Sequence, residues 1–285
     1  MAFNGFTLAD DEENAKEFFR TRLSDQRRLS RAATSFTRSC ILSLVRQALS
    51  HGMTYSGIRR LISSLEDRKN SVFYLNGIII TFSSRIKKML TEAAYSRIAA
   101  LCDEEDDEEE KRLRSIANDV IGSPHGVYEL DNSLSDYSRR VGLEAELVAL
   151  SALSSGKSYE SVKKELSNED TFIDSPIIKE EKDKNAFIAL RLGEYLKDDE
   201  RKYAFNDVSK AVAAAVSFWY ALAVDAAYVS SFGTQFYLVK RGSSYPCALC
   251  DSMRGIHSGW DELPPYHKNC CCIAIPVTLN LIYDE

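Results

Sequence analysis

The chain has 285 residues, of which 45% are hydrophobic and 27% are charged, a composition that is ordinary for a globular protein of one large or two modest domains. The formal net charge is −6, and the acidic run at 103–110 more than accounts for it, so overall acidity neither favours nor excludes a nucleic-acid partner. The first 20 residues lack the apolar segment of a secretory signal, and an odd number of cysteines, seven, favours a reducing compartment over a disulfide framework.

The first predicted element is a long helix from about residue 10 to about residue 50, which follows a segment at 1–9 that we expect to be frayed. One face of this helix is apolar at spacings of three and four residues, with Leu29, Ala33, Phe36, Cys40 and Leu44. The other face is basic, with Arg20, Arg22, Arg27, Arg28, Arg31, Arg38 and Arg46. The basic face is either a solvated helix surface or a contact for DNA phosphates or an acidic partner. In the DNA alternative, the contacts come from Arg20, Arg27, Arg28 and Arg31.

Capping residues and glycines divide the next part of the chain. Gly52 is expected to end the long helix, and Thr54 is expected to cap a short helix at 55–67. Residues 72–82 then allow two interpretations. They form either a β-hairpin that turns at Asn76-Gly77 or a loop that leads directly into the following helix.

The acidic run at 103–110 is expected to be a solvated loop or the start of a helix predicted at 111–121. It lacks the alternating Asp, Asn and Gly of a calcium-binding loop. His125 lies in a break that contains glycine and proline, and we expect it at the surface. Two further helices are predicted at 134–154 and 159–166.

The sequence contains a weak internal echo. Residues 48–60 and 152–164 share a pattern of helix, glycine, Ser or Thr cap, and short basic helix. The pattern indicates either a repeated helical hairpin or independent use of the same favourable capping residues.

A long apolar helix is predicted at 206–231, after a polar loop at 168–182 and a helix at 184–197. Its apolar stretch at 211–229 is interrupted by polar residues and is too short for a clean membrane span of about 20 residues. We therefore expect a buried core helix and no membrane contact. Asp225 within it is expected either to pair with a core residue or to join a polar seam that faces the cysteine cluster described next.

Five of the seven cysteines fall in the last part of the sequence, between two strands predicted to pair, at 236–239 and 273–281. The candidate metal ligands are Cys247, Cys250, His267, Cys270 and Cys272. Thiolates and an imidazole in closely spaced pairs are typical of structural zinc sites. Alternate residues of an extended segment face opposite sides, so Cys271 is expected to point away, and either Cys270 or Cys272 completes the site. A disulfide cluster and reduced, unliganded thiols are the alternatives.

Enzyme chemistry is disfavoured by the residues around this motif. Pro246-Cys247-x-x-Cys250 matches half of the zinc-deaminase signature, but none of the four histidines is followed two residues later by the glutamate that acts as general acid and base. Four or five ligands favour a closed site over a catalytic site with an open position. His257 and the acidic residues of the same loop are expected to be ordinary loop residues. We predict that the protein is not an enzyme.

The C-terminal pattern resembles the C-terminal module of phage Mu-type minor head proteins, the phage head-morphogenesis family. The shared features are Cys-x-x-Cys, then Gly255, then Pro-Pro-x-His-x-Asn-Cys-x-Cys. Where the family usually reads His-Pro-Asn-Cys-Arg-Cys, this chain reads His-Lys-Asn-Cys-Cys-Cys at 267–272, so the Pro and the Arg are both replaced. The resemblance covers the chain from about residue 206 onward; before that, only helical content and a local pattern are similar.

The resemblance implies a structural role in head assembly, inside the procapsid near the portal. Its implied partners are the portal, other head proteins and packaged DNA; its implied locations are the capsid interior and the host cytoplasm. We expect a mainly α protein, with a helical bundle-like region at 1–205 and a small α+β zinc-knuckle module at 206–285. Two other functions are considered: a toxin-like effector or nuclease-type enzyme that has the same knuckle, and a nucleic-acid-binding zinc-knuckle protein.

Overall fold

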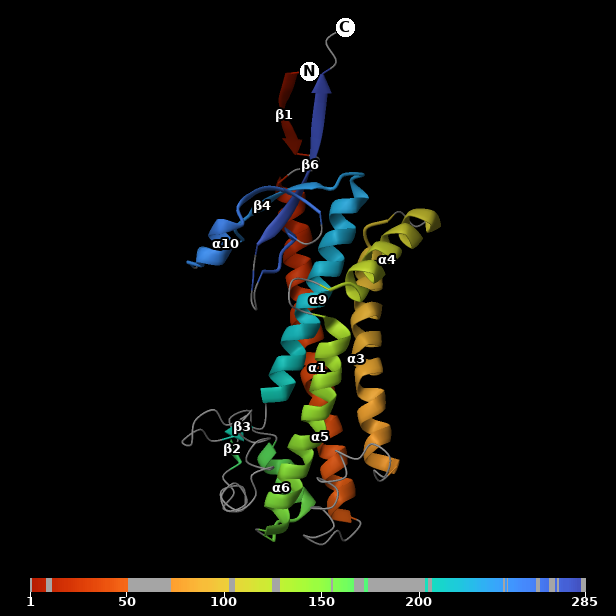
Figure 1. Ribbon diagram of the computed structural model, residues 1–285, viewed down its shortest axis with the longest axis vertical. Helices are drawn as coiled ribbons and strands as arrows, with labels where there is room; N and C mark the ends of the chain where they lie inside the picture. The colour runs from red at the N-terminus through yellow and green to blue at the C-terminus, as the bar shows by residue number, and fades with distance from the viewer. Residues whose placement is uncertain are drawn as a thin grey trace. The chain divides into compact units, whose positions relative to one another are not determined.

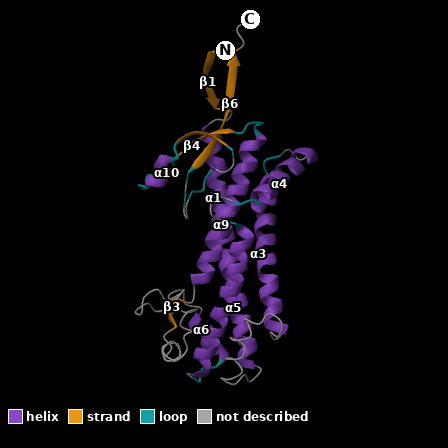
Figure 2. Cartoon of the chain, in the orientation of Figure 1, coloured by secondary structure: helices purple, strands orange, loops and turns teal. Residues whose placement is uncertain are grey.

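The computed structural model describes residues 2–8, 12–50, 73–102, 106–124, 129–154, 156–166, 172–173, 203–204, 207–242, 244, 246–259, 262–266, 270 and 272–282. These residues form a mainly α-helical protein with a small sheet toward the C-terminal end of the sequence, which confirms the predicted fold class (Figures 1 and 2). The helices are α1 (Glu12–Ser50), α3 (Phe73–Ala99), α4 (Asp107–Gly122), α5 (Leu130–Ser154), α6 (Tyr159–Leu166), α9 (Asp207–Ser231) and α10 (Ala248–Ser252).

The principal sheet has four strands in the order β1-β6-β4-β5, and every neighbouring pair is antiparallel. Its strands are β1 (Ala2–Leu8), β4 (Phe236–Lys240), β5 (Gly255–Ser258) and β6 (Ile273–Ile282). The predicted pairing of the two strands that flank the cysteine motif is confirmed, with Leu238 opposite Ile275. The expected frayed segment at 1–9 is wrong for residues 2–8, because β1 pairs with β6 from the other end of the sequence. A two-stranded ribbon joins β2 (Phe172–Ile173) to β3 (Tyr203–Ala204).

The chain divides into two compact units. Unit 1 comprises Met1–Ala32, Ile86–Ser133 and Ala213–Glu285, and unit 2 comprises Ala33–Arg85 and Leu134–Val212. Unit 1 therefore combines segments from both ends of the sequence. The expected division at 205/206, into a helical region and a zinc-knuckle module, stays a prediction.

The core of unit 1 is built where α1, α3 and α9 pack together. On α3, apolar residues recur every four positions, and Ile86, Leu90, Ala94 and Ile98 are fully buried. This spacing places them on one helix face. Between α1 and α9, the Phe18 ring stacks on the Tyr228 ring with centroids 3.8 Å apart. These contacts place the first half of α1 directly against α9 (Figure 1).

Helix α9 is the core helix predicted from its composition. All residues at 221–229 are buried. Among the described residues, Val208–Ser231 is the one helical segment long and apolar enough to cross a bilayer, and most of it is buried inside the protein. Its alanines leave room for neighbouring helices to approach closely.

Unit 2 is built from the second half of α1, the start of α3, most of α5, α6 and the first turn of α9. The Phe36 and Phe82 rings are stacked with centroids 5.8 Å apart. The Ser83 hydroxyl donates to the Leu134 carbonyl at 3.0 Å. Cys40 is buried among these helices, as predicted, and burial raises the pKa of its thiol to about 11. A buried, protonated thiol behaves as a small apolar core residue.

The structure decides two questions that the sequence left open. Both interpretations of residues 72–82, the hairpin and the loop, are wrong, because α3 already begins at Phe73 and runs through Asn76-Gly77. The acidic run starts a helix: the Asp106 side chain caps α4 and accepts a hydrogen bond from the Glu109 amide at 3.0 Å. Acidic residues in a first turn complement the helix dipole, which favours helix over loop here.

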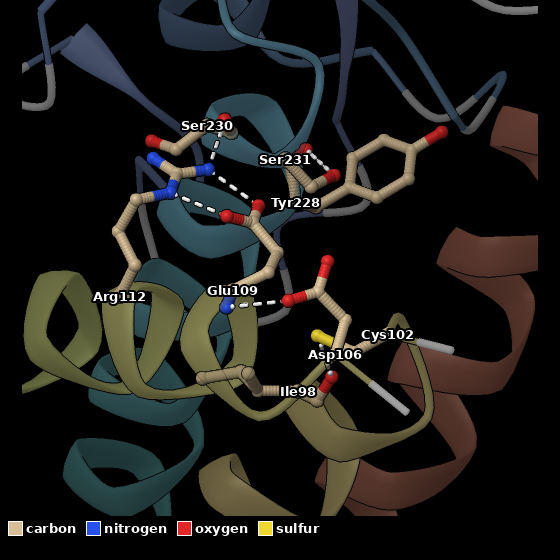
Figure 3. Close-up of polar contacts among 8 residues, drawn as sticks. All are labelled: Ile98, Cys102, Asp106, Glu109, Arg112, Tyr228, Ser230 and Ser231. Atoms are coloured by element: carbon tan, nitrogen blue, oxygen red, sulfur yellow. Dashed lines mark hydrogen bonds and ion pairs between the residues drawn. The ribbon is translucent and has the colours of Figure 1, made fainter. Parts of the chain in front are cut away.

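The start of α4 is fixed to the end of α9 within unit 1 (Figure 3). Arg112 pairs with Glu109 one turn earlier, with nitrogen–oxygen distances of 2.6 and 2.5 Å. The same guanidinium donates to the Ser230 carbonyl at 3.0 Å. The Ser230 carbonyl also accepts a hydrogen bond from the Gly233 amide at 3.0 Å, so Arg112 adds a second donor to the last turn of α9.

The outcome of the remaining helix predictions depends on position. The helix at 159–166 is α6 as predicted, with Ser158 accepting a hydrogen bond from the Ser161 amide at 3.3 Å. Gly156 before it has a φ of +61°, the left-handed conformation expected of a glycine that ends a helix. The helices predicted at 55–67 and 184–197, together with Gly52, Thr54 and His125, lie outside the described residues. The internal repeat therefore stays a prediction.

Candidate metal centre

The pairing of β4 with β6 brings the two halves of the cysteine motif together. Lys240, the last residue of β4, lies opposite Ile273, the first residue of β6. The segment that leaves β4 and the segment that enters β6 are therefore neighbours. The first leads to Cys247 and Cys250 on α10, and the second contains Cys270 and Cys272. Cysteines 20 or more positions apart in sequence thus meet at one end of this strand pair.

Helix α10 presents the first pair of cysteines from a tight turn. Cys247 is its N-cap residue, and the Cys247 carbonyl accepts a hydrogen bond from the Asp251 amide at 2.9 Å. Cys250 lies one turn into the helix and is 3% exposed. Residues three apart on a helix share a face, so the turn directs both cysteines to the same side.

Three thiols converge in the interior. The sulfur atoms of Cys250, Cys270 and Cys272 all lie within 4.8 Å of one another, and those of Cys250 and Cys270 are 3.9 Å apart. All three residues are buried. A tetrahedral zinc site with Zn–S bonds of about 2.3 Å needs sulfur atoms about 3.8 Å apart. The cluster can therefore hold a metal ion with little rearrangement.

The structure places the five predicted ligands in different ways. Cys250, Cys270 and Cys272 form the cluster. The sequence left open whether Cys270 or Cys272 completes the site, and both are in the cluster. Cys247 is half-buried and interacts with the Cys250 side chain, but it lies outside the group of three mutually close sulfurs. His267, like Cys271, lies outside the described residues.

The thiols are electrostatically coupled. The pKa of Cys270 is lowered to about 5, chiefly because the Cys272 thiol donates a hydrogen bond to its sulfur. The pKa of Cys272 is raised, mainly by that same hydrogen bond, and the pKa of Cys250 is raised to about 12, mainly by burial. One thiolate is thus stabilised by neighbouring thiols. A soft cation would take the place of the protons they share.

A buried ion pair lies in the helical core of the same unit. Arg22 and Asp225 are both fully buried, and the Arg22 Nε atom is 3.1 Å from Asp225 Oδ1. The guanidinium also donates to Gln26 Oε1 at 3.2 Å and lies over the Phe19 ring, 5.0 Å from its centroid. Of the two alternatives for Asp225, the paired core residue is observed. The Cys270 charge also raises its pKa, so the carboxyl lies within electrostatic range of the cluster.

The placement of Arg22 on the exposed basic face is wrong. Arg22 is seven residues before Leu29, and seven residues are two helical turns, so both residues lie on the apolar face. That spacing is the signal in the sequence that could have identified it. The core partner of Asp225 is therefore Arg22, a residue that the pattern of arginines had placed in solvent.

The rest of the basic face is largely exposed. Arg20 pairs with Glu17 at 3.4 Å and Arg28 pairs with Asp25 at 3.3 Å. Arg27 is also exposed. So is Arg31. Within the described part of the chain, neither of these two has an ion-pair partner.

His257, which was expected to be an ordinary loop residue, lies in β5, and both of its ring nitrogens are engaged. Its Nδ1 lies 2.8 Å from Glu262 Oε2, and its Nε2 lies 2.9 Å from the Met253 carbonyl. These contacts connect β5 to the turn before it, through Met253, and to the loop after it, through Glu262. His257 therefore holds the backbone of the module and leaves no nitrogen for a metal.

Comparisons with protein-family models, with curated proteins and with solved structures find no match. The functional argument therefore starts from the cysteine cluster and its surroundings.

Proposed function

We propose that this chain is a minor head, or head-morphogenesis, protein of a phage or prophage, and that its C-terminal module is held together by one structural zinc ion. The observation that supports the metal site is the convergence of three buried thiols from two segments of the sequence. The motif that places them is the one that resembles the head-protein family. Portal and other head proteins are the proposed partners, and the capsid interior is the proposed location.

The surroundings of the cluster support a structural over a catalytic ion. A catalytic zinc keeps one coordination position open beside a general base. Here the three cysteines are each less than 5% exposed, and both ring nitrogens of His257 are occupied by hydrogen-bond partners outside the cluster. When bound, zinc would cross-link α10 to the start of β6. Cys250, Cys270 and Cys272 would hold it, with Cys247 or His267 as the fourth ligand.

Native mass spectrometry of the purified full chain tests the metal site. We expect about one zinc ion per chain, and its loss in Cys270→Ser. Cys40→Ser is the matched control, since Cys40 belongs to unit 2 and the motif belongs to unit 1. A chain that is folded and metal-free when purified with zinc present would contradict the proposal.

The head-assembly role needs a separate test in the phage or prophage that encodes the chain. We expect the protein in procapsids at a few copies per particle, measured by quantitative mass spectrometry of purified particles. Deleting the gene should leave heads that fail to assemble or to package DNA. Normal, infectious particles without the protein would contradict this role, whatever the metal content.

A second candidate function, binding of nucleic acid, is favoured by two exposed arginines of α1 that have no ion-pair partner among the described residues. Arg27 and Arg31 are one helical turn apart, and two like charges at this spacing destabilise an isolated helix slightly. Phosphates would relieve that repulsion. We expect Arg27→Gln with Arg31→Gln to weaken DNA binding and to flatten its dependence on salt by about two phosphate contacts. Equal salt slopes for the variant and the unaltered chain would remove this function.

A further inference from the structure

The thiol cluster has a cationic neighbour that no metal-ligand motif includes. Arg241 directly follows β4, one residue beyond the pair formed by Lys240 and Ile273. Continuing the antiparallel register places its backbone beside Cys272. Its side chain is only 16% exposed. A guanidinium is thus held close to the cluster by the strand pairing that also assembles the thiols.

The Arg241 guanidinium contacts both ends of the Cys247–Cys250 turn. Its Nη1 lies 2.6 Å from Asp251 Oδ1 and 3.4 Å from the Cys247 carbonyl oxygen. The Cys247 carbonyl also accepts a hydrogen bond from the Asp251 amide, which is the first hydrogen bond of α10. The Arg241 side chain therefore contacts Cys247, which begins the turn, and Asp251, which directly follows Cys250.

Charge points to the same role. The Asp251 carboxylate, 2.6 Å from the Arg241 Nη1 atom, anchors the guanidinium beside the cysteine turn. Three or four thiolates around a dication have a net negative charge, and here they are buried. A nearby permanent cation stabilises such a cluster, and arginine stays charged at any relevant pH.

We propose that Arg241 is a positioning residue of the metal centre: it holds the Cys247–Cys250 turn in the ligating conformation and offsets the negative charge of the bound thiolates. This inference rests on the proposed zinc site. Partners around metal ligands typically change metal affinity about 10–100-fold when they are removed. Arg241 is therefore a determinant of zinc affinity without being a ligand.

The experiment measures zinc affinity of the full chain by competition with a chromogenic chelator. Arg241→Gln should bind zinc about 10–100-fold more weakly than the unaltered chain. Arg241→Lys keeps the positive charge but not the several donors of the guanidinium, and its zinc affinity should fall less than that of Arg241→Gln. Arg254→Gln is the matched control, because Arg254 is exposed in the same module. Its affinity should be unchanged.

Two further readouts separate positioning from general damage to the fold. Cobalt at saturation should give the same sulfur-to-metal charge-transfer band in Arg241→Gln as in the unaltered chain, because the ligands are intact. The pH at which half the zinc is released should be higher in Arg241→Gln, since its thiolates form less readily. Asp251→Asn, which leaves Arg241 in place but weakens its anchor, should show a smaller change in the same direction.

The outcomes distinguish this inference from the zinc proposal itself. Zinc affinity of Arg241→Gln within twofold of the unaltered chain would overturn the role of Arg241 and leave the zinc site standing. Absence of zinc binding by the unaltered chain would overturn the zinc site. If Arg241→Gln does not fold, Arg241→Lys and Asp251→Asn decide the question by the same affinity measurement, and no change in either would overturn the inference.

Discussion

Unit 1 contains two regions that bury very different side chains. Its helical region, from α1, α3 and α9, encloses Trp219, Tyr220 and Phe19, all nearly or fully buried. The C-terminal module, from β4, α10, β5 and β6, also buries apolar side chains, and Tyr237, Leu263 and Ile275 are at most 1% exposed. It differs from the helical region because it also buries a cluster of three thiols, and because two of its apolar residues, Leu249 and Ile256, are 48% and 41% exposed.

The difference has a consequence for stability. Each large apolar side chain that is fully buried contributes about 1.5–3 kcal/mol, so the helical region needs no ligand. A structural zinc ion contributes about 10 kcal/mol or more to a small module. We therefore expect the two regions to respond differently to metal removal and to core substitutions, and the following predictions exploit that difference.

The largest effect is expected for Cys250→Ser. Losing one sulfur from the cluster should abolish zinc binding and remove most of the roughly 10 kcal/mol that the ion contributes. Limited proteolysis should then cut the module while α1, α3 and α9 stay protected. Cys102→Ser is the control, since Cys102 is half-buried, lies outside the module and donates to the Ile98 carbonyl (Figure 3). Resistance equal to that of the unaltered chain would argue against metal-dependent folding of the module.

The next largest effect is expected for Asp225→Ala in the helical region. At a pH above about 8, where the Asp225 carboxyl is ionised, it leaves Arg22 buried without a counter-ion, which typically costs about 3–5 kcal/mol. Denaturant unfolding followed by helix circular dichroism measures the loss. Replacing both partners, Arg22→Met with Asp225→Leu, should recover most of it. A double variant as unstable as the single one would show that the pair contributes more than mutual neutralisation.

The pH dependence of stability sharpens this prediction. Burial raises the pKa of the Asp225 carboxyl from 3.8 to about 8, although Arg22 opposes the shift. The native state then holds this proton more tightly than the unfolded chain does. The contribution of this group is therefore complete below 3.8 and declines as the pH rises toward about 8. Asp225→Asn should flatten that decline, and an unchanged pH profile would show that another group causes it.

A smaller loss, about 2–5 kcal/mol, is expected for Leu90→Ala, which opens a cavity in the α3 face of the core. Leu90 is fully buried, whereas Lys88 on the same helix is exposed, so Lys88→Ala serves as the control. Denaturant unfolding measures the stability, and native mass spectrometry measures the zinc content. Zinc content should not change, because the cluster lies in the other region. Loss of zinc in Leu90→Ala would show that the two regions are not separable.

The smallest effect is expected for Asp106→Ala, which removes the N-cap of α4. The loss should be about 0.5–2 kcal/mol, because one amide hydrogen bond and a favourable charge at the helix N-terminus disappear. Thermal unfolding of the variant and of Asp106→Asn, which keeps a capping oxygen, measures it. Equal destabilisation of the two variants would indicate that the charge matters and the hydrogen bond does not.

Local patterns in the sequence predicted the elements that local interactions determine. The bounds of α6 follow from Ser158 and Gly156, and the apolar run of α9 gives a core helix. The meeting of Cys250 with Cys270 follows from paired strands on either side of the motif. In each case the relevant residues are neighbours in sequence or are linked by one strand pairing.

The sequence was less informative where distant segments decide the structure. The pairing of β1 with β6 joins the two ends of the sequence, and no local pattern in residues 2–8 predicts this pairing. Helix α3 runs through Asn76-Gly77, although Asn-Gly is a favourable turn pair. The contact of Arg241 with the Cys247–Cys250 turn depends equally on a strand register that the sequence alone did not give.

Hydrogen–deuterium exchange of the full chain, with zinc and after chelation, tests the central claim most directly. The account predicts that chelation removes protection from the amides of β4, α10, β5 and β6. Those of α1, α3 and α9 should keep their protection. Unchanged protection of the module after complete zinc removal would contradict the account, as would equal loss of protection in both regions.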